Sequence, residues 1–233
     1  MTRLDGASVL VAGATGGLGA PISRRLAAAG ARPTLVARSA DRLEALADEL
    51  GGAATAALDL REPAAATAAV DAAVRAHGRL DGLVFAAGVV AFGPAVETDD
   101  RTMGHLLELN VLAPVRLLRS AVPHLERAAG DRGSAFVANI SAVVAERPTA
   151  GMAAYSASKA ALTAYDVAAA RELRRRRVHV LDVRPPHTET GLAGRPISGE
   201  PPRLPTGLDP EDVARRVLAA VEADERDLPA AAF

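Results

Sequence analysis

Cysteine is absent from this chain of 233 residues, which excludes disulfides, thiolate catalysis and Cys-based metal sites, and we expect no bound metal. Long apolar runs are absent too, since no stretch reaches the roughly 18 apolar residues that span a bilayer. The start of the chain lacks the charged stretch and apolar core of a signal peptide. The formal net charge of −1 gives no electrostatic argument for nucleic acid. We therefore expect a cytoplasmic protein with neither nucleic-acid nor membrane partners.

Lysine is nearly absent, because Lys159 stands alone against 26 Arg and 54 Ala. The chain uses Arg wherever a positive charge is sufficient. A single Lys against this bias indicates a role that a guanidinium does not fill, such as a compact donor or a group whose pKa can shift. An ordinary surface Lys is the alternative.

Apolar, β-branched runs alternate with Ala-rich stretches at helical spacing along the whole chain. The predicted strands are residues 7–13, 32–38, 53–58, 81–88, 134–141 and 178–184. The predicted helices are residues 18–29, 41–50, 62–77, 100–127, 153–176 and 210–223. Strands that are apolar on both faces are typical of a parallel sheet covered by helices. No linker or repeat interrupts the pattern, so residues 1–233 are predicted to form one doubly wound α/β domain.

A glycine-rich turn follows the first predicted strand and opens the next helix. Glycines at this place allow a tight turn and let a pyrophosphate approach backbone N–H groups at the positive end of a helix. The spacing is G-x-x-x-G-x-G rather than the common G-x-G-x-x-G, and close packing alone is the alternative explanation. Its position on the first βα turn favours a dinucleotide site formed by Gly13, Thr15, Gly16, Gly17, Leu18 and Gly19.

The residues after the next two predicted strands bear on which dinucleotide is bound. The carboxylate that would hold a ribose diol is absent after the second strand, where Arg38 stands. An Arg there can bind a 2′-phosphate, so NADP(H) is favoured over NAD(H), unless Arg38 is an ordinary solvated side chain. Asp59 ends the third strand. It either meets the adenine amino group or, with Glu62 and Pro63, caps the following helix.

The most specific pattern is the pair Tyr155 and Lys159, in which one of only two Tyr stands four residues before the only Lys. On a helix, this spacing places both side chains on one face. A free phenol has a pKa of about 10, and a nearby ammonium favours the phenolate and lowers that pKa. The pair can then exchange a proton with a substrate oxygen.

With these motifs the chain resembles the short-chain dehydrogenase/reductase family over nearly its whole length. The resemblance rests on Gly13, Gly17 and Gly19, on the Tyr155 to Lys159 pair, and on their separation. It implies a single Rossmann-type domain, hydride transfer between a nicotinamide ring and a carbonyl or alcohol, and a homo-oligomer, either dimer or tetramer. It implies that Tyr155 donates or accepts the proton and that Lys159 binds the nicotinamide ribose and lowers the Tyr pKa. Further implied cofactor contacts are Leu60, Ala87, Gly88, Pro185, Thr188 and Thr190.

Asn110, within the long helix predicted at 100–127, matches the family's Asn that holds a water in the proton relay from Lys159. The sequence supports this match independently. Pro114 has no N–H to donate to the Asn110 carbonyl four residues back, so that carbonyl is free inside a helix. The alternative is that Asn110 and Pro114 merely kink the helix.

The sequence departs from the family where a Ser normally donates a hydrogen bond to the substrate oxygen, because that position is Ala142. Ser141 stands one residue early, on the opposite face of a regular strand, and replaces the missing group only where the strand end is bulged or turned. His187 is a second candidate donor, with a solvated loop His as the alternative. Losing such a donor costs about 10² to 10³ in rate. Lesser departures are Ala86 and Pro186, where the family has Asn and Gly.

The segment 185–208 carries six Pro and four Gly and has no helical period. A loop of this length in a compact domain is usually functional, and it leaves the last predicted parallel strand at the edge where ligands bind. We expect it to be a lid over the substrate. The surrounding segments are mostly Ala, Val, Pro and Gly, which favours a small, apolar substrate.

Two functions fit these patterns. The first is an NADP(H)-dependent oxidoreductase that interconverts a carbonyl and a secondary alcohol, with Tyr155 as acid/base. The second keeps the fold without the redox step, because Ala142 removes a donor: a dehydratase, a cyclase or lyase, or a non-catalytic dinucleotide-binding protein.

Overall fold

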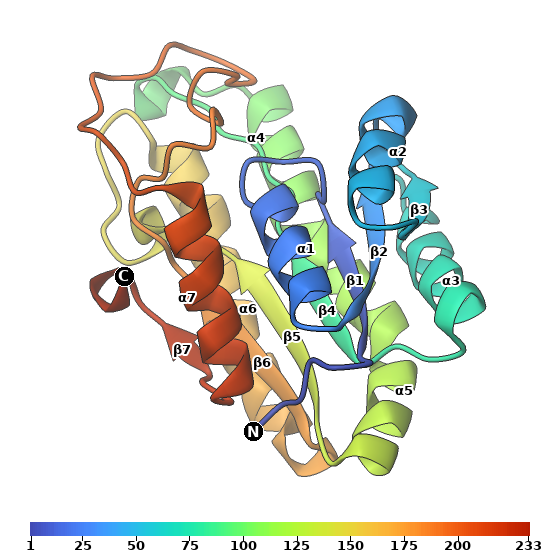
Figure 1. The fold of residues 1–233 in the computed structure, drawn as a ribbon. Coiled ribbons are helices and arrows are strands. Elements are labelled where there is room, and N and C mark those ends of the chain that lie inside the picture. Colours follow the sequence, from blue (N-terminus) through green and yellow to red (C-terminus); the bar gives the residue numbers. More distant parts are fainter.

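The structure, a computed structural model, describes residues 1–233 as one parallel sheet covered by helices on both faces (Figure 1). The strand order is β3-β2-β1-β4-β5-β6-β7. All neighbouring strands pair in parallel, as the predicted doubly wound fold requires. The strands are β1 (Ser8–Ala12), β2 (Arg32–Ala37), β3 (Ala54–Ala57), β4 (Gly82–Phe85), β5 (Ala135–Ile140), β6 (Val178–Val183) and β7 (Asp227–Leu228).

Two helical layers bury the two faces of the sheet. One apolar cluster joins the sheet to α1 (Gly19–Ala28), α2 (Ala40–Glu49) and α7 (Pro210–Glu222). A second cluster joins the other face to α3 (Ala65–His77), α5 (Ala113–Arg132) and α6 (Ala153–Leu173). The strands are apolar on both faces because both are covered. No helix combines the length and the hydropathy that crossing a bilayer requires.

The six predicted strands are confirmed, but the sequence analysis missed β7 and misjudged one helix. The helix predicted at 100–127 is α4 (Asp100–Leu107), a π-helical segment η2 (Glu108–Leu112) and α5, which continues to Arg132. β7 escaped prediction because it has only two residues and lies among polar ones. Four short 3-10 turns complete the chain: η1 (Ala95–Glu97), η3 (Val143–Ala145), η4 (Arg174–Arg176) and η5 (Ala230–Ala232).

The order of the strands fixes where a ligand can bind. The chain moves outward from β1 to β3 and then returns to place β4 on the other side of β1. In open α/β sheets, ligands bind beyond the carboxyl ends of the strands at such a switch point. The glycine turn after β1 and the segment after β4 both leave the sheet there.

The long loop after β6 arches over the same edge of the sheet (Figure 1). Its two ends meet in an isolated parallel bridge between Thr188 and Leu208. Its middle is joined to the segment after β4 by two backbone hydrogen bonds of 2.9 Å, from Ile197 N–H to Val90 and from Phe92 N–H to Ser198. The loop therefore has fixed contacts across the strand ends although it contains no helix.

Candidate active site

The glycine turn between β1 and α1 leaves no room for side chains. Gly13 has a φ of +81°, and a Cβ there would lie 2.6 Å from the Ala87 nitrogen. A Cβ on Gly19 would lie 2.0 Å from the Gly13 oxygen, and one on Gly17 would lie 2.5 Å from the Thr190 Cβ. Close packing within the chain therefore accounts for these three glycines, and it is compatible with a ligand beside the turn.

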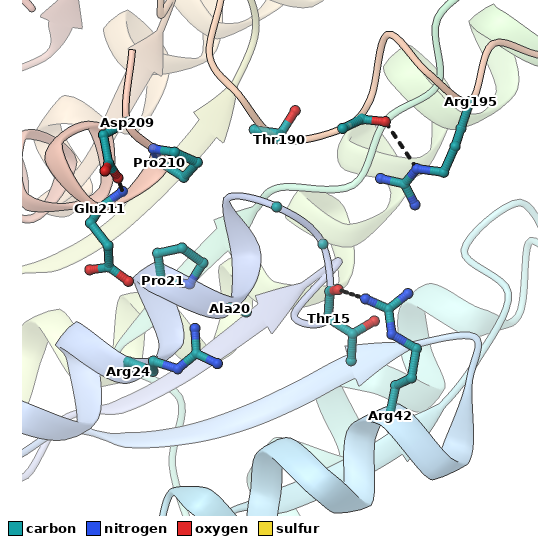
Figure 2. A pocket seen from close by; sticks show the side chains of 13 residues that line it. Thr15, Ala20, Pro21, Arg24, Arg42, Thr190, Arg195, Asp209, Pro210 and Glu211 are labelled. Atoms are coloured by element: carbon teal, nitrogen blue, oxygen red, sulfur yellow. Dashed lines mark hydrogen bonds between the residues drawn. The ribbon is translucent and has the colours of Figure 1, made fainter. Parts of the chain in front are cut away.

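The same turn leaves the N-terminus of α1 uncapped. Leu18 makes no side-chain cap, and the first helical turn contains no acidic residue. The N–H groups of Gly17 and Leu18 donate to no acceptor in the chain. A cavity of about 490 Å³ lies beside the turn, and Thr15 and Gly16 are among the residues that line it (Figure 2). Free amides at the positive end of a helix fit the pyrophosphate of a dinucleotide.

Arginines face this cavity from three segments. Figure 2 shows Arg42 of α2 donating to the Thr15 backbone oxygen, and Arg195 of the long loop, whose Nε lies 3.1 Å from the Gly191 oxygen. Arg24 of α1 lines the cavity as well but is paired with Glu49, and the carboxylates of Asp209 and Glu211 also belong to the lining. Arg42 and Arg195, which form no ion pair in the chain, further favour an anionic ligand.

Arg38 and Asp59, the residues expected at the adenosine end, follow β2 and β3. Hydrogen bonds from Arg61 lower the pKa of Asp59, and the charge of exposed Arg38 lowers it further. The expectation that Asp59 caps a helix is wrong, because α3 begins only at Ala65. Asp59 instead accepts from the Arg61 N–H and closes the turn that contains buried Leu60 and precedes α3.

Tyr155 and Lys159 lie one turn apart on α6, and both are buried. The Lys159 Nζ lies 6.0 Å from the centroid of the Tyr155 ring, so the predicted pair is brought together. Nζ donates to the Ile140 oxygen at the end of β5, at 2.9 Å. An ammonium has three donors, so this bond anchors Lys159 to the sheet and leaves donors for a ligand.

Burial shifts both pKa values. It raises the pKa of the Tyr155 phenol above its ordinary value and lowers the pKa of Lys159 to about 8. The charges of Asp182 and Asp166 partly oppose the effect on Lys159. In the chain alone, desolvation therefore outweighs the expected lowering of the Tyr pKa by Lys159. At neutral pH the phenol keeps its proton and Lys159 is mostly an ammonium.

Asn110 lies in the π-helical segment η2, where the helix is wider than a regular α-helix. The Ala113 N–H donates to the Glu108 carbonyl five residues back, immediately before Pro114. The predicted disturbance of the helix by Pro114 is thus a widened turn rather than a simple kink. Such turns occur often at functional sites.

The Asn110 side chain joins three parts of the site. Its Oδ1 accepts from the Val89 N–H at 3.0 Å, and its Nδ2 donates to the Val89 oxygen at 2.9 Å and to Ser158 Oγ at 3.0 Å. A Cβ on Gly88 would lie 3.4 Å from Asn110 Oδ1 and 3.6 Å from the Lys159 Nζ. Asn110, Gly88 and Lys159 are therefore neighbours, as the resemblance implied.

Ser141 does not supply the hydroxyl that is missing at Ala142, because its own hydroxyl is bonded to α6. The Ser141 hydroxyl donates to the Lys159 backbone oxygen at 3.1 Å and lies 3.1 Å from the Thr163 hydroxyl. Its single proton is used to hold α6 against the sheet. His187 lies 3.6 Å from the Glu189 carboxylate on the long loop.

Apolar side chains surround Tyr155. Val90 and Phe92 from the segment after β4 and Val144 from η3 form one cluster with it. Ala142 and the loop residues Leu192 and Ala193 pack against this cluster. The walls near the phenol are therefore apolar, as expected for an apolar substrate.

The remaining loop residues expected near the cofactor are held by backbone contacts. The Thr188 hydroxyl donates to the Pro186 oxygen at 2.9 Å, and the Thr190 hydroxyl accepts from the Leu192 N–H at 3.3 Å. The Pro185 oxygen accepts from the Val143 N–H at 3.0 Å. Thr190 is the residue of this group that touches the glycine turn, at Gly17.

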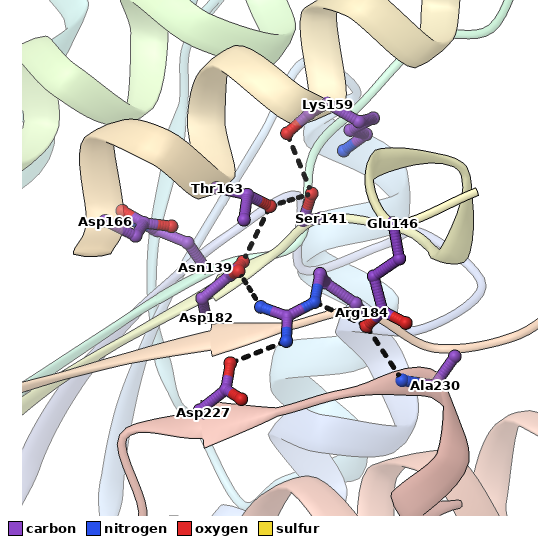
Figure 3. Close-up of polar contacts among 10 residues, drawn as sticks. All are labelled: Asn139, Ser141, Glu146, Lys159, Thr163, Asp166, Asp182, Arg184, Asp227 and Ala230. Carbon is purple, nitrogen blue, oxygen red and sulfur yellow. Dashed lines mark hydrogen bonds and ion pairs between the residues drawn. The ribbon is translucent and has the colours of Figure 1, made fainter. Parts of the chain in front are cut away.

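Sequence reasoning missed a charged cluster behind α6, in which Arg184 meets Asp182, Glu146 and Asp227 (Figure 3). Asp182 and Arg184 are two residues apart, but Glu146 and Asp227 are far from both in the chain, so no local spacing connects the whole cluster. The available signal was Asp182, a carboxylate between two apolar residues near the end of strand β6. A charge in a buried strand requires a partner.

Comparisons with known proteins agree with this geometry. A family model described as short chain dehydrogenase matches residues 7–200. The Dehydrogenase/reductase SDR family member 7B of Danio rerio is 30% identical over 237 residues, which cover 94% of this chain and 75% of that protein.

Two solved structures share the fold over nearly the whole chain. A 3-ketoacyl-(acyl-carrier-protein) reductase from Brucella melitensis, complexed with NADH, has a TM-score of 0.88 and 25% identity, with 97% of both chains covered. A short chain dehydrogenase from Burkholderia cenocepacia, in complex with NADP, has a TM-score of 0.84 and 30% identity, with 98% of both chains covered.

Proposed function

The chain belongs to the short-chain dehydrogenase/reductase family, and on that basis we propose that it is an NADP(H)-dependent oxidoreductase interconverting a carbonyl and a secondary alcohol. Membership makes it an NAD(P)-dependent enzyme, and its solved neighbours bind NADH and NADP. The observation that carries the proposal is the buried pair of Tyr155 and Lys159, 6.0 Å from ring centroid to Nζ, at the carboxyl edge of the sheet.

The residues around the cavity fit a dinucleotide. The uncapped amides of Gly17 and Leu18 would hold its pyrophosphate, and the Lys159 ammonium would hold the nicotinamide ribose. Bound there, the nicotinamide ring supplies or accepts the hydride. Asn110, next to Lys159, is proposed to hold the water of the proton relay.

Tyr155 is proposed to act as the acid in reduction. Burial raises the pKa of its phenol, so the group holds its proton at neutral pH and can donate it to a carbonyl oxygen. The Lys159 ammonium stabilises the phenolate that remains. Because Ala142 has no hydroxyl, we propose that the Tyr155 hydroxyl is the hydrogen-bond donor to the substrate oxygen.

The preference for NADP(H) is proposed from Arg38, which is exposed after β2 where a carboxylate would select NAD(H). Arg42, in the first turn of α2 and bonded to the Thr15 oxygen, adds a second cation near the glycine turn. The loop 185–208 is proposed to cover the substrate. A homo-oligomer, dimer or tetramer, and a cytoplasmic location stay predictions.

The acid role is tested with the two tyrosines of α6. Tyr155→Phe should reduce NADPH oxidation with a reactive carbonyl compound by about 10² to 10⁴. Tyr165→Phe is the matched control, because it removes the same hydroxyl from a half-buried position on the same helix and should leave turnover unchanged. Equal turnover in the Tyr155→Phe variant and the parent would show that Tyr155 is not the acid.

The cofactor preference is tested separately by calorimetric titration with NADPH and NADH. The parent should bind NADPH more tightly, and Arg38→Gln should weaken NADPH binding without changing NADH binding. Equal affinities in the parent would remove the inference from Arg38.

A non-redox function remains a second candidate, because Ala142 lies beside Tyr155 and Ser141 is held by α6. A dehydratase, cyclase or lyase, or a non-catalytic dinucleotide-binding protein, would keep the fold. Ala142→Ser discriminates between the two. A gain in NADPH-linked reduction of up to about 10² to 10³ would favour a weakened reductase. No gain across a broad panel of carbonyl compounds would favour the non-redox function.

A further inference from the structure

One buried arginine ties together three segments behind the proposed active site (Figure 3). Arg184, only 7% exposed, directly follows β6. Its Nε lies 2.5 Å from Glu146 Oε1, and one terminal nitrogen lies 2.6 Å from Asp227 Oδ1. The other terminal nitrogen pairs with Asp182. Glu146 follows η3, Asp182 belongs to β6 and Asp227 belongs to β7, so a single guanidinium holds three carboxylates from different segments.

Glu146 connects this cluster to the segment that covers Tyr155. Burial raises its pKa, but the hydrogen bonds from Arg184 and from the Ala230 N–H lower it by more, so the carboxylate is ionised at neutral pH. Val144, two residues earlier, packs in the apolar cluster that contains Tyr155. The position of η3 against the phenol therefore depends on where Glu146 is held.

Asp182 connects the same cluster to α6. Its Oδ1 lies 3.3 Å from the Thr163 hydroxyl, one helical turn after Lys159. Thr163 also lies 3.1 Å from the Ser141 hydroxyl, which donates to the Lys159 backbone oxygen. Arg184 is thus linked both to η3 and to the turn of α6 that carries the Lys.

We propose that Arg184 is a positioning residue that fixes the distance between η3 and the face of α6 that carries Tyr155 and Lys159. Ser141 holds the end of β5 to α6 at Lys159, but η3 meets Tyr155 through apolar packing, which sets no precise distance. The charge-assisted bonds of Arg184 to Glu146 and Asp182 are directional and supply that distance. Without the guanidinium, three neighbouring carboxylates would repel one another and separate the segments that they belong to.

The proposal rests on the proposed reductase function for its kinetic test. Glu146→Ala is the mild variant, since it releases η3 while Arg184 keeps Asp182 and Asp227. Its kcat should fall about tenfold, because small misplacements of reacting groups are costly. Its Kd for NADPH should change less than about twofold, because the glycine turn is untouched. Arg184→Lys should also lower kcat, since one ammonium cannot reproduce the fork geometry.

Arg79→Gln is the matched control. Arg79 holds the buried Asp81 at 2.6 Å at the opposite ends of the strands. This variant should lower the midpoint of thermal unfolding at least as much as Glu146→Ala while leaving kcat unchanged. A Glu146→Ala protein with the kcat of the parent would overturn the proposal, as would a loss of kcat that Arg79→Gln reproduces.

A second readout needs neither cofactor nor substrate. The chain has two Tyr and no Trp, so the fluorescence of a Tyr165→Phe protein reports Tyr155 alone. Tyr155 is buried, and a displaced η3 admits solvent, so acrylamide should quench this fluorescence more strongly in the Glu146→Ala protein. Unchanged quenching in the Glu146→Ala protein would overturn the proposal. A parent protein without any NADPH-linked turnover would instead defeat the proposed function, and this quenching measurement would still decide the role of Arg184.

Discussion

The two buried ion clusters, one at each end of the parallel sheet, have opposite charge balances. At the amino ends, one buried carboxylate, Asp81, faces two arginines, with Arg79 at 2.6 Å and Arg132 at 3.9 Å. Asp81 also accepts the Ser8 N–H at 2.8 Å and so joins β1 to β4. Cations outnumber the carboxylate there, and the carboxylate is fully paired.

In the buried cluster at the carboxyl ends the balance is reversed, because Glu146, Asp182 and Asp227 share Arg184. Asp166 of α6 lies nearby and bonds Asn139 through one oxygen, while its other oxygen has no partner. Burial raises the pKa of Asp166 well above its usual range. At the amino ends the buried charge is fully paired. At the carboxyl ends, charges and hydrogen-bonding groups remain that can still bind a ligand or a proton.

The comparison predicts that the amino-end cluster contributes stability without activity. Asp81→Ala removes the partner of Arg79 and of the Ser8 N–H, and it should lower the free energy of unfolding by about 3 kcal/mol. Urea unfolding measures this loss. The kcat and the Kd for NADPH, measured on the folded fraction, should equal those of the parent. A change in either would show that the two ends are not independent.

A change in the loop over the carboxyl ends should instead affect activity more than stability. Gly199 has a φ of +73°, and a Cβ there would lie 2.0 Å from the Phe92 oxygen. Gly199→Ala should therefore detach the loop from the segment after β4, at a local cost of about 1 to 2 kcal/mol. Hydrogen exchange at Ile197 and Phe92 should accelerate, and the KM for the carbonyl substrate should rise. Gly194→Ala, where a Cβ meets nothing closer than 3.7 Å, is the control and should change neither.

The pH dependence of dinucleotide binding isolates the charge at the carboxyl ends. Burial lowers the pKa of Lys159 to about 8, so affinity for NADPH should fall as pH rises through 8, by at most about tenfold per pH unit. Lys159→Gln should bind weakly at every pH and show no such slope. The same shift affects stability with the opposite sign. Above pH 8 the unfolded chain binds more protons than the folded one, so this group adds stability as pH rises toward 10.

The smallest effect is expected where the charges are exposed. Arg176 and Glu126 pair at 2.5 Å, but both side chains are at least one-third exposed. Arg176→Gln should change the free energy of unfolding by less than about 0.5 kcal/mol. A larger loss of unfolding free energy in urea would show that burial does not explain the difference in stability between the paired clusters of the sheet and surface ion pairs.

Much of the fold could be predicted because its signals are local. The strands β1, β2 and β4 are short apolar runs, and the glycine turn is contiguous in the sequence. Tyr155 and Lys159 could be paired because a helix converts a spacing of four residues into proximity. The position of Asn110 beside Lys159 was implied by the family resemblance, Pro114 gave independent support for a free carbonyl at Asn110, and the structure agrees with the position.

The parts that could not be predicted depend on contacts between distant segments. The Arg184 cluster draws on residues 146, 182 and 227. The hydrogen bond from the Ser141 hydroxyl to the Lys159 backbone oxygen depends on how α6 packs on β5. The prediction that Asp59 caps α3 failed because five residues, 60–64, separate it from the start of that helix. The desolvation that raises the Tyr155 pKa is a property of the assembled core, and no spacing encodes it.

The contact between Gly17 and Thr190 has a consequence for the sequence of binding events. A Cβ at Gly17 would overlap the Thr190 backbone, so the turn below and the root of the loop above rest directly on each other. With the proposed role of the loop as a cover over the substrate, this contact leads us to expect that the nucleotide binds first and that the substrate follows it. Steady-state inhibition patterns should accordingly show an obligatory order, with the nucleotide first to arrive and last to leave.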